Sequence, residues 1–241
     1  MVALPTFYHS IQVLLSSETS PEHAIQAAQT ASVTFITHFR QIISNPKSHH
    51  HTLPNPTTAI QSLFLLLAQL YSHSKLTGPH QPAQVADIIL DLVTNTLSLI
   101  NELCSLAIKA AIYNDAPPRE YRDALCRGIL ALMGACGPTS ELRGGVLLVL
   151  MLEFRAVRNS RREGRVACLA RDDVLWYLCA MIEECVAGME GGVSDVCARQ
   201  VRDLMWESFT GENGMEMSKG DWLAWKVCGL VCGVGGVGFE V

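Results

Sequence analysis

Four arginines at helical spacing are the side chains in this sequence best suited to hold an anion. They are Arg155, Arg158, Arg162 and Arg165. On a continuous helix their guanidinium groups would share one face and could clamp a phosphate or carboxylate. Asn159 and Gly164 interrupt the helical pattern, and acidic neighbours would neutralise part of the charge. We interpret the cluster as a salt-bridged helix end, with a surface for an anionic partner as the alternative. The cluster has no interleaved aromatic residues for base stacking, so we expect no specific nucleic-acid binding.

Three of the four tryptophans gather near the C-terminus, at Trp206, Trp222 and Trp225. Trp222 and Trp225 are three residues apart, and Leu223 and Val227 make this segment apolar nearly all round. A helix of that kind is typically buried. We therefore interpret the tryptophans as a structural corner that docks the last two helices. The alternative is an aromatic-lined pocket for a small apolar ligand.

The remaining motifs give no catalytic mechanism. The glycines from Gly233 to Gly238 match a dinucleotide-binding loop in letters, but too few residues follow to form the helix that would receive the pyrophosphate. His49 to His51 are adjacent in a proline-flanked loop, where three imidazoles cannot easily converge on one metal ion. Ser72 and Lys75 have Ser-x-x-Lys spacing without the companion motifs of that enzyme class. The sequence therefore predicts no catalytic residue, no cofactor and no metal.

Composition points to a folded protein of a reducing compartment. Apolar residues make up 49% of the 241 residues, charged residues 17%, and the net charge is −5. The nine cysteines are an odd number without a Cys-x-x-Cys pair, which favours free, mostly buried thiols. The first residues lack a basic segment before an apolar stretch, so we predict no signal peptide, and we expect no apolar run to reach the length of a membrane span. We expect a cytoplasmic protein, with the nucleus as the alternative and no membrane partner.

Apolar residues recur at helical spacing along nearly the whole chain, and proline, glycine and capping residues divide them into segments. Ser20-Pro21-Glu22 is a helix start signal, and Ser218 resembles the first residue of a capping box. Residues 83–112 contain no proline or glycine and predict one long helix, or two helices joined near Thr94-Asn95. The other predicted helices are a short one from residue 5 or 6, then 21–43, 57–71, a segment ending near 136, 146–157, 174–187 opened by Asp172 or Asp173, a helix capped by Ser194-Asp195, and a last one from 218.

These segments predict an all-α fold, a single irregular multi-helix bundle of about nine helices over residues 1–241. The first hundred residues hold only three of the 18 basic and four of the 23 acidic residues. That shift in charge favours two lobes within the one domain, residues 1–100 and 101–233, followed by a glycine-rich tail at 233–241. No repeat of 30 to 45 residues appears, so a solenoid is not predicted.

The C-terminal region resembles a family of filamentous-fungal proteins known as a domain of unknown function. The resemblance rests on Trp206 near a helix end, a loop with Gly211 to Gly214, Ser218 as the cap, and Trp222-Leu-Ala-Trp225-Lys226. Asp221 stands where the family usually has arginine. The resemblance implies a helical intracellular protein, and some family members are encoded near secondary-metabolite genes. It carries over no catalytic residue.

Together these patterns predict a non-catalytic helical protein that acts as an interaction or accessory module. A groove between helices, or the surface from Arg155 to Arg165, would hold the protein partner. The alternative is a small-molecule-binding protein, or an unusual enzyme, with a pocket near the tryptophans. An exposed apolar patch over a solid core would favour a protein partner, and an enclosed apolar pocket would favour a ligand.

Overall fold

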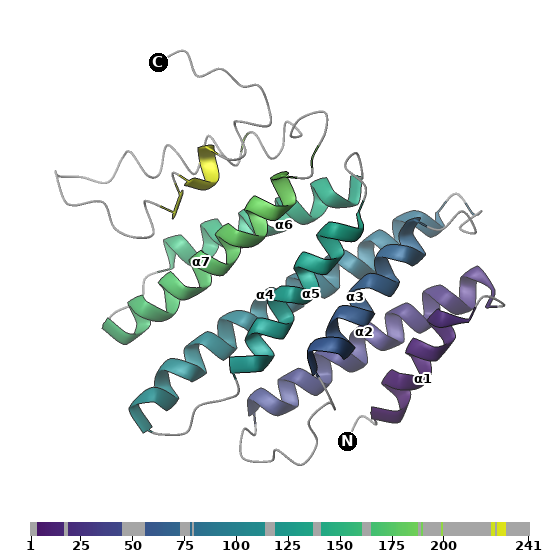
Figure 1. The fold of residues 1–241 in the computed structure, drawn as a ribbon, viewed down its shortest axis with the longest axis horizontal. Helices are drawn as coiled ribbons and strands as arrows, with labels where there is room; N and C mark the ends of the chain where they lie inside the picture. The colour runs from purple at the N-terminus through teal and green to yellow at the C-terminus, as the bar shows by residue number, and fades with distance from the viewer. Residues whose placement is uncertain are drawn as a thin grey trace. The chain divides into compact units, whose positions relative to one another are not determined.

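The computed structural model describes residues 4–16, 19–44, 56–72, 78, 80–113, 119–136, 141–160, 165–187, 189, 199, 223–224 and 226–229. This part of the chain contains the helices α1 to α7 and no strand (Figure 1), so the predicted all-α class is confirmed. The chain divides into two compact units, Met1–Cys136 and Gly137–Val241. The division differs from the boundary suggested by charge, because residue 100 lies inside α4.

The first unit contains five helices, and most begin and end where capping residues and prolines predict. They are α1 (Leu4–Leu15), α2 (Pro21–Ser44), α3 (Pro56–Ser72), α4 (Gln81–Tyr113) and α5 (Arg119–Ala135). Ser20 caps α2 as predicted: its hydroxyl accepts a hydrogen bond from the His23 N–H at 3.4 Å, and its carbonyl accepts one from Ala24 at 2.9 Å.

Helix α4 is one continuous helix, which resolves the alternative left open at Thr94-Asn95. Both side chains bond back to the carbonyl four residues earlier: Thr94 donates to Leu90 and Asn95 to Asp91, each at 2.8 Å. These bonds satisfy the two polar side chains without breaking the backbone pattern of the helix.

The stretch Gln81–Ala107 of α4 is long and apolar enough to cross a membrane by length and composition, contrary to our expectation that no run reaches that length. In the structure this helix packs against α2, α3 and α5. Its fully buried residues include Val85, Ile89 and Val93, so the apolar composition serves the core of the first unit.

Aromatic rings join three helices in the core of this unit. Phe7 of α1 lies 6.4 Å from Phe35 of α2, and Phe35 lies 4.8 Å from Phe39 between ring centroids. Phe39 meets Tyr121 of α5 edge to face at 5.6 Å. Ring pairs at these separations add to the free energy gained from their buried area.

Helices α3 and α5 form the most extensive packing contact of the unit, and a glycine lets them approach closely. A Cβ atom placed on Gly128 of α5 would lie 2.7 Å from the Ile60 side chain and 2.8 Å from the Phe64 ring of α3. Both of these side chains are completely buried. The glycine in the middle of α5 is therefore explained by helix packing.

The second unit contains α6 (Glu141–Asn159) and α7 (Arg165–Ala187), which pack against each other. Residues 146–150, which alone could have formed a buried strand, are helical as predicted. Our predicted start of α7 at Asp172 or Asp173 is wrong, because the helix begins at Arg165. Asp172 lies within the helix, where its carboxylate is 3.4 Å from the Arg171 guanidinium. The aspartates therefore belong to the helix surface and do not cap its start.

A buried arginine joins the two helices of this unit. Arg143, in the first turn of α6, is 5% exposed. Its guanidinium donates hydrogen bonds to the carbonyls of Cys185 at 2.7 Å and Glu184 at 3.0 Å in the last turn of α7. These bonds satisfy two carbonyls that have no partner within the helix, and the negative end of the α7 dipole stabilises the charge.

Candidate functional site

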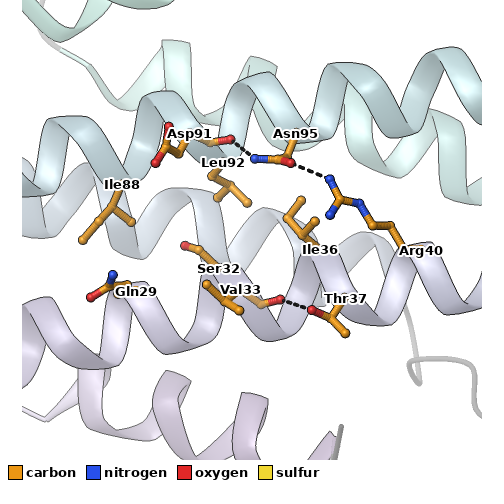
Figure 2. A pocket seen from close by; sticks show the side chains of 10 residues that line it. All are labelled: Gln29, Ser32, Val33, Ile36, Thr37, Arg40, Ile88, Asp91, Leu92 and Asn95. Atoms are coloured by element: carbon orange, nitrogen blue, oxygen red, sulfur yellow. Dashed lines mark hydrogen bonds between the residues drawn. The ribbon is translucent and has the colours of Figure 1, made fainter. Parts of the chain in front are cut away.

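A groove lies between α2 and α4 in the described part of the first unit. We call it the α2/α4 groove (Figure 2), and its volume is about 250 Å³. Apolar side chains from both helices form its base, and polar side chains form its edges. The lining residues are Gln29, Ser32, Val33, Ile36, Thr37 and Arg40 of α2, and Ile88, Asp91, Leu92 and Asn95 of α4.

The spacing of the lining residues explains how two helices make one groove. On α2 they recur at three- and four-residue steps from Gln29 to Arg40, and on α4 they do the same from Ile88 to Asn95. Each set is therefore one stripe of a helix surface. The α2 stripe extends over about 16 Å, at 1.5 Å per residue. The groove is about three helical turns long.

Two hydrogen bonds between α2 and α4 show that these helices run parallel. Gln81, the first residue of α4, donates to the Glu22 carboxylate near the start of α2 at 3.4 Å. Arg40, near the end of α2, donates to the Asn95 side-chain oxygen at 2.8 Å. Asn95 is itself held by its bond to the Asp91 carbonyl (Figure 2). The bond from Arg40 lies at one end of the groove, and the bond from Gln81 lies about two helical turns before its other end.

Val33 is the most unusual residue of the groove, because 61% of its surface is exposed. The buried stripe of α2 contains Ala28, Ala31 and Phe35, and Val33 falls off that stripe. A single exposed valine is ordinary on a protein surface. Here it lies beside a groove with an apolar base, which makes it part of a larger apolar surface that a partner could cover.

Ser32 lies on the groove side of α2 (Figure 2) and is 7% exposed. Among the described residues its hydroxyl has no hydrogen-bond partner. A buried hydroxyl without a partner lowers the stability of the free protein, and such costs in native proteins call for an explanation beyond folding.

We expect Ser32→Ala to raise the free energy of unfolding by about 1–2 kcal/mol. The substitution removes the unpaired hydroxyl and introduces the best helix-forming residue. Thr96→Val is the matched control, because the Thr96 hydroxyl is also buried and unpaired among the described residues but lies outside the groove. Urea denaturation followed by circular dichroism measures both variants. A loss of stability in Ser32→Ala would mean that its hydroxyl has a partner in solution.

The structure does not bring the four predicted arginines onto one helix. Arg155 and Arg158 lie near the end of α6, which stops at Asn159, and Arg165 is the first residue of α7. Arg162 and the side chain of Arg165 lie outside the described residues. Arg155 and Arg158 are half-buried, and each interacts with other groups of the protein. Their role as a partner surface stays a prediction.

The three predicted tryptophans, Trp206, Trp222 and Trp225, lie outside the described residues, as do His49 to His51 and the glycines at 233–238. Part of the last predicted helix is described, and 223–224 and 226–229 are helical. Leu223 and Val227 are buried there. Lys226 forms an ion pair of 2.7 Å with Glu183 of α7, which raises the pKa of the lysine. The predicted corner is therefore described only in part.

The fourth tryptophan was not among the predicted site residues. Trp176 of α7 is 53% exposed and meets Tyr177 edge to face, at 5.3 Å between ring centroids. Its place on α7 is three residues after Asp173, on the exposed face of the helix. The same amphipathic pattern in the sequence would have identified it as exposed.

The buried thiols are poorly suited to nucleophilic chemistry. The six cysteines whose side chains are described are all buried. Burial, together with the nearby Cys104 and Asp123, raises the pKa of the Cys126 thiol from 9.0 to about 12. Burial also raises the pKa of Cys179. Since the thiolate is the reactive form, both groups stay protonated and inert at neutral pH.

We expect Cys126 to make stability decrease at high pH. Its thiol keeps its proton in the folded state up to about pH 12, whereas in the unfolded chain it loses the proton near pH 9. The folded state therefore binds more protons between these values, and stability falls by up to about 1.4 kcal/mol per pH unit. Below pH 9 the contribution is fully present.

Comparison with Cys126→Ala isolates this group from the other residues that titrate at high pH. The stability difference between the unchanged protein and the variant should be constant near neutral pH and should shrink as the pH rises above 9. Urea denaturation at several pH values measures this difference. A difference that is independent of pH would show that the thiol ionises equally in both states.

Nothing in the described ranges adds a second chemical site. No three His, Cys, Asp or Glu side chains in these ranges gather closely enough to hold a metal ion. Burial raises the pKa of Glu153 on α6. Cys126, Glu153, Cys179 and Lys226, whose pKa values are raised, do not line the α2/α4 groove.

Comparisons with protein-family models, with curated proteins and with solved structures found no match to this chain. The resemblance to the filamentous-fungal family therefore stays a prediction.

Proposed function

We propose that this chain is a non-catalytic interaction module, acting inside the cell, and that the α2/α4 groove holds its partner. The observation that carries the proposal is the exposed Val33 beside an apolar base made by Ile36, Ile88 and Leu92. A partner that covers this surface would gain the free energy of removing apolar area from water.

The size of the groove favours a protein partner over a small molecule. Its volume of about 250 Å³ is below the range of roughly 300–1,000 Å³ in which most small-molecule sites fall. Val33, which lines the groove, is 61% exposed, so most of its surface is open to a partner that approaches from solvent. The ligand-binding alternative now depends on the region of Trp206, Trp222 and Trp225, and native mass spectrometry of the purified protein tests it.

Affinity capture with a matched pair of variants tests the proposal. Val33→Gln places a polar group on the groove, and Leu15→Gln makes the same kind of change at a leucine that is 65% exposed on α1. Neither change removes a buried contact, so both variants should fold. We expect a protein retained by the unchanged chain to be lost from Val33→Gln and kept by Leu15→Gln. Equal retention by the two variants would place the interaction elsewhere.

A further inference from the structure

We propose that the occupant of the α2/α4 groove is an amphipathic helix of a protein partner, with basic side chains on the edge that faces α4. The inference rests on the proposed function, since it names the partner's chemistry at the same groove.

The length and borders of the groove fit a helix. The lining residues of α2 extend over about three turns, and two parallel helices form the walls. A groove between two packed helices accepts a row of side chains from a third helix at three- and four-residue spacing. Described residues offer no strand edge to which an extended peptide could add.

The two edges of the groove differ in charge. On the α4 edge, Asp91 lines the groove and Asp87 lies one turn earlier on the same face. Both aspartates are exposed, and among the described residues neither carboxylate has a cation or a hydrogen-bond donor beside it. On the α2 edge, Gln29 and Thr37 are neutral. An incoming helix therefore meets unpaired negative charge on one side only.

Among the described residues that line the groove, Arg40 is the single cation, and it already has a hydrogen-bond partner. Arg40 lies at the far end from Asp87 and donates to Asn95 at 2.8 Å. The Arg40 guanidinium donates to a neutral amide and lies at one end of the groove. The two aspartates act along the α4 edge. The bias toward basic residues in the partner should thus exceed any bias toward acidic ones.

Selection from a display library of helical peptides against the full chain tests this inference. The peptides are about 14 residues long, which covers the groove at 1.5 Å per residue. Their apolar positions are fixed at three- and four-residue spacing, and their flanking positions are randomised among charged and neutral residues. Peptides that bind Val33→Gln equally well are discarded, because they do not use the groove.

We expect the retained peptides to be enriched in lysine and arginine on one flank. A selected peptide should bind Asp87→Asn/Asp91→Asn about tenfold more weakly, as the loss of two surface ion pairs implies, and the affinity for the unchanged chain should fall with added salt. Leu15→Gln should bind it as the unchanged chain does.

Two other outcomes are distinguishable. Retained peptides without a basic bias, bound equally by Asp87→Asn/Asp91→Asn, would overturn the inference about charge and leave the groove as an interaction site. Failure to retain any peptide that depends on Val33 would overturn the amphipathic-helix occupant. The capture experiment with Val33→Gln and Leu15→Gln then decides separately whether the proposed function stands.

Discussion

Arg143→Ala should lower the free energy of unfolding of the second unit by about 3–5 kcal/mol. The guanidinium makes two charge-assisted hydrogen bonds to the carbonyls of Glu184 and Cys185, and each such bond contributes about 1.5–3 kcal/mol. Without it, both carbonyls lose their arginine partner at the end of α7. The cavity left by a buried side chain adds to the loss. Urea denaturation followed by far-ultraviolet circular dichroism measures the change.

Two further substitutions identify the cause of this effect. Arg143→Lys keeps the charge but lacks the planar fork that reaches two carbonyls, so it should recover less than half of the loss. Arg171→Ala removes a partly exposed arginine of α7 paired with Asp172 at 3.4 Å, and it should cost less than about 1 kcal/mol. If Arg143→Ala cost no more than Arg171→Ala, the α7 carbonyls would have other partners in solution.

Local signals along the sequence predicted the all-α class and most helix ends. Ser20-Pro21 predicts the start of α2, because the serine cap and the proline at the first helical position are properties of that segment alone. The continuity of α4 follows in the same way from the absence of proline and glycine in residues 83–112. Such signals do not depend on distant parts of the chain, which is why they succeed.

The start of α7 shows where local signals fail. Asp172 and Asp173 have side chains that favour the N-cap position of a helix, but α7 begins before them, at Arg165. An aspartate on the surface of a helix and an aspartate at its start look the same in one sequence. Only the residues before them, from Arg165, distinguish the two cases.

The burial of Arg143 could have been predicted from the sequence. It lies on the same stripe as Val146, Leu147 and Leu150, which are all fully buried. A basic residue in the first turn of a helix is also unfavourable beside the positive end of the helix dipole. A cation on an apolar stripe at that position indicates a tertiary partner, although the sequence does not say which carbonyls it meets.

The α2/α4 groove could not be predicted from the sequence, because it depends on which faces of two helices lie side by side. Val33 gave a partial signal as an apolar residue off the buried stripe of α2. Asp87 and Asp91 are ordinary surface residues of α4 until α2 is placed beside them. The tryptophan corner stays a prediction, since Trp206, Trp222 and Trp225 lie outside the described residues.

Phe64→Ala should lower the free energy of unfolding of the first unit by about 3–5 kcal/mol, because the ring is fully buried and its removal leaves a cavity between α3 and α5. Gly128→Ala should destabilise the same contact from the other side, by about 1–3 kcal/mol, since the added methyl group would lie within 2.7 Å of Ile60 and 2.8 Å of Phe64. This loss exceeds the gain of up to about 1 kcal/mol that alanine gives within a helix.

The two substitutions should cost less together than their sum, because in Phe64→Ala the methyl group of residue 128 can enter the space that the ring has left. Contact with Ile60 remains, so we expect a coupling of about 1 kcal/mol rather than full relief. Gly134→Ala is the control on the same helix, where nothing lies within 4 Å and the change should be stabilising. Denaturation of the four proteins of the cycle measures the coupling. If the two losses of stability were additive, α3 and α5 would move apart as rigid bodies, and the methyl group at residue 128 would not use the space left by the Phe64 ring.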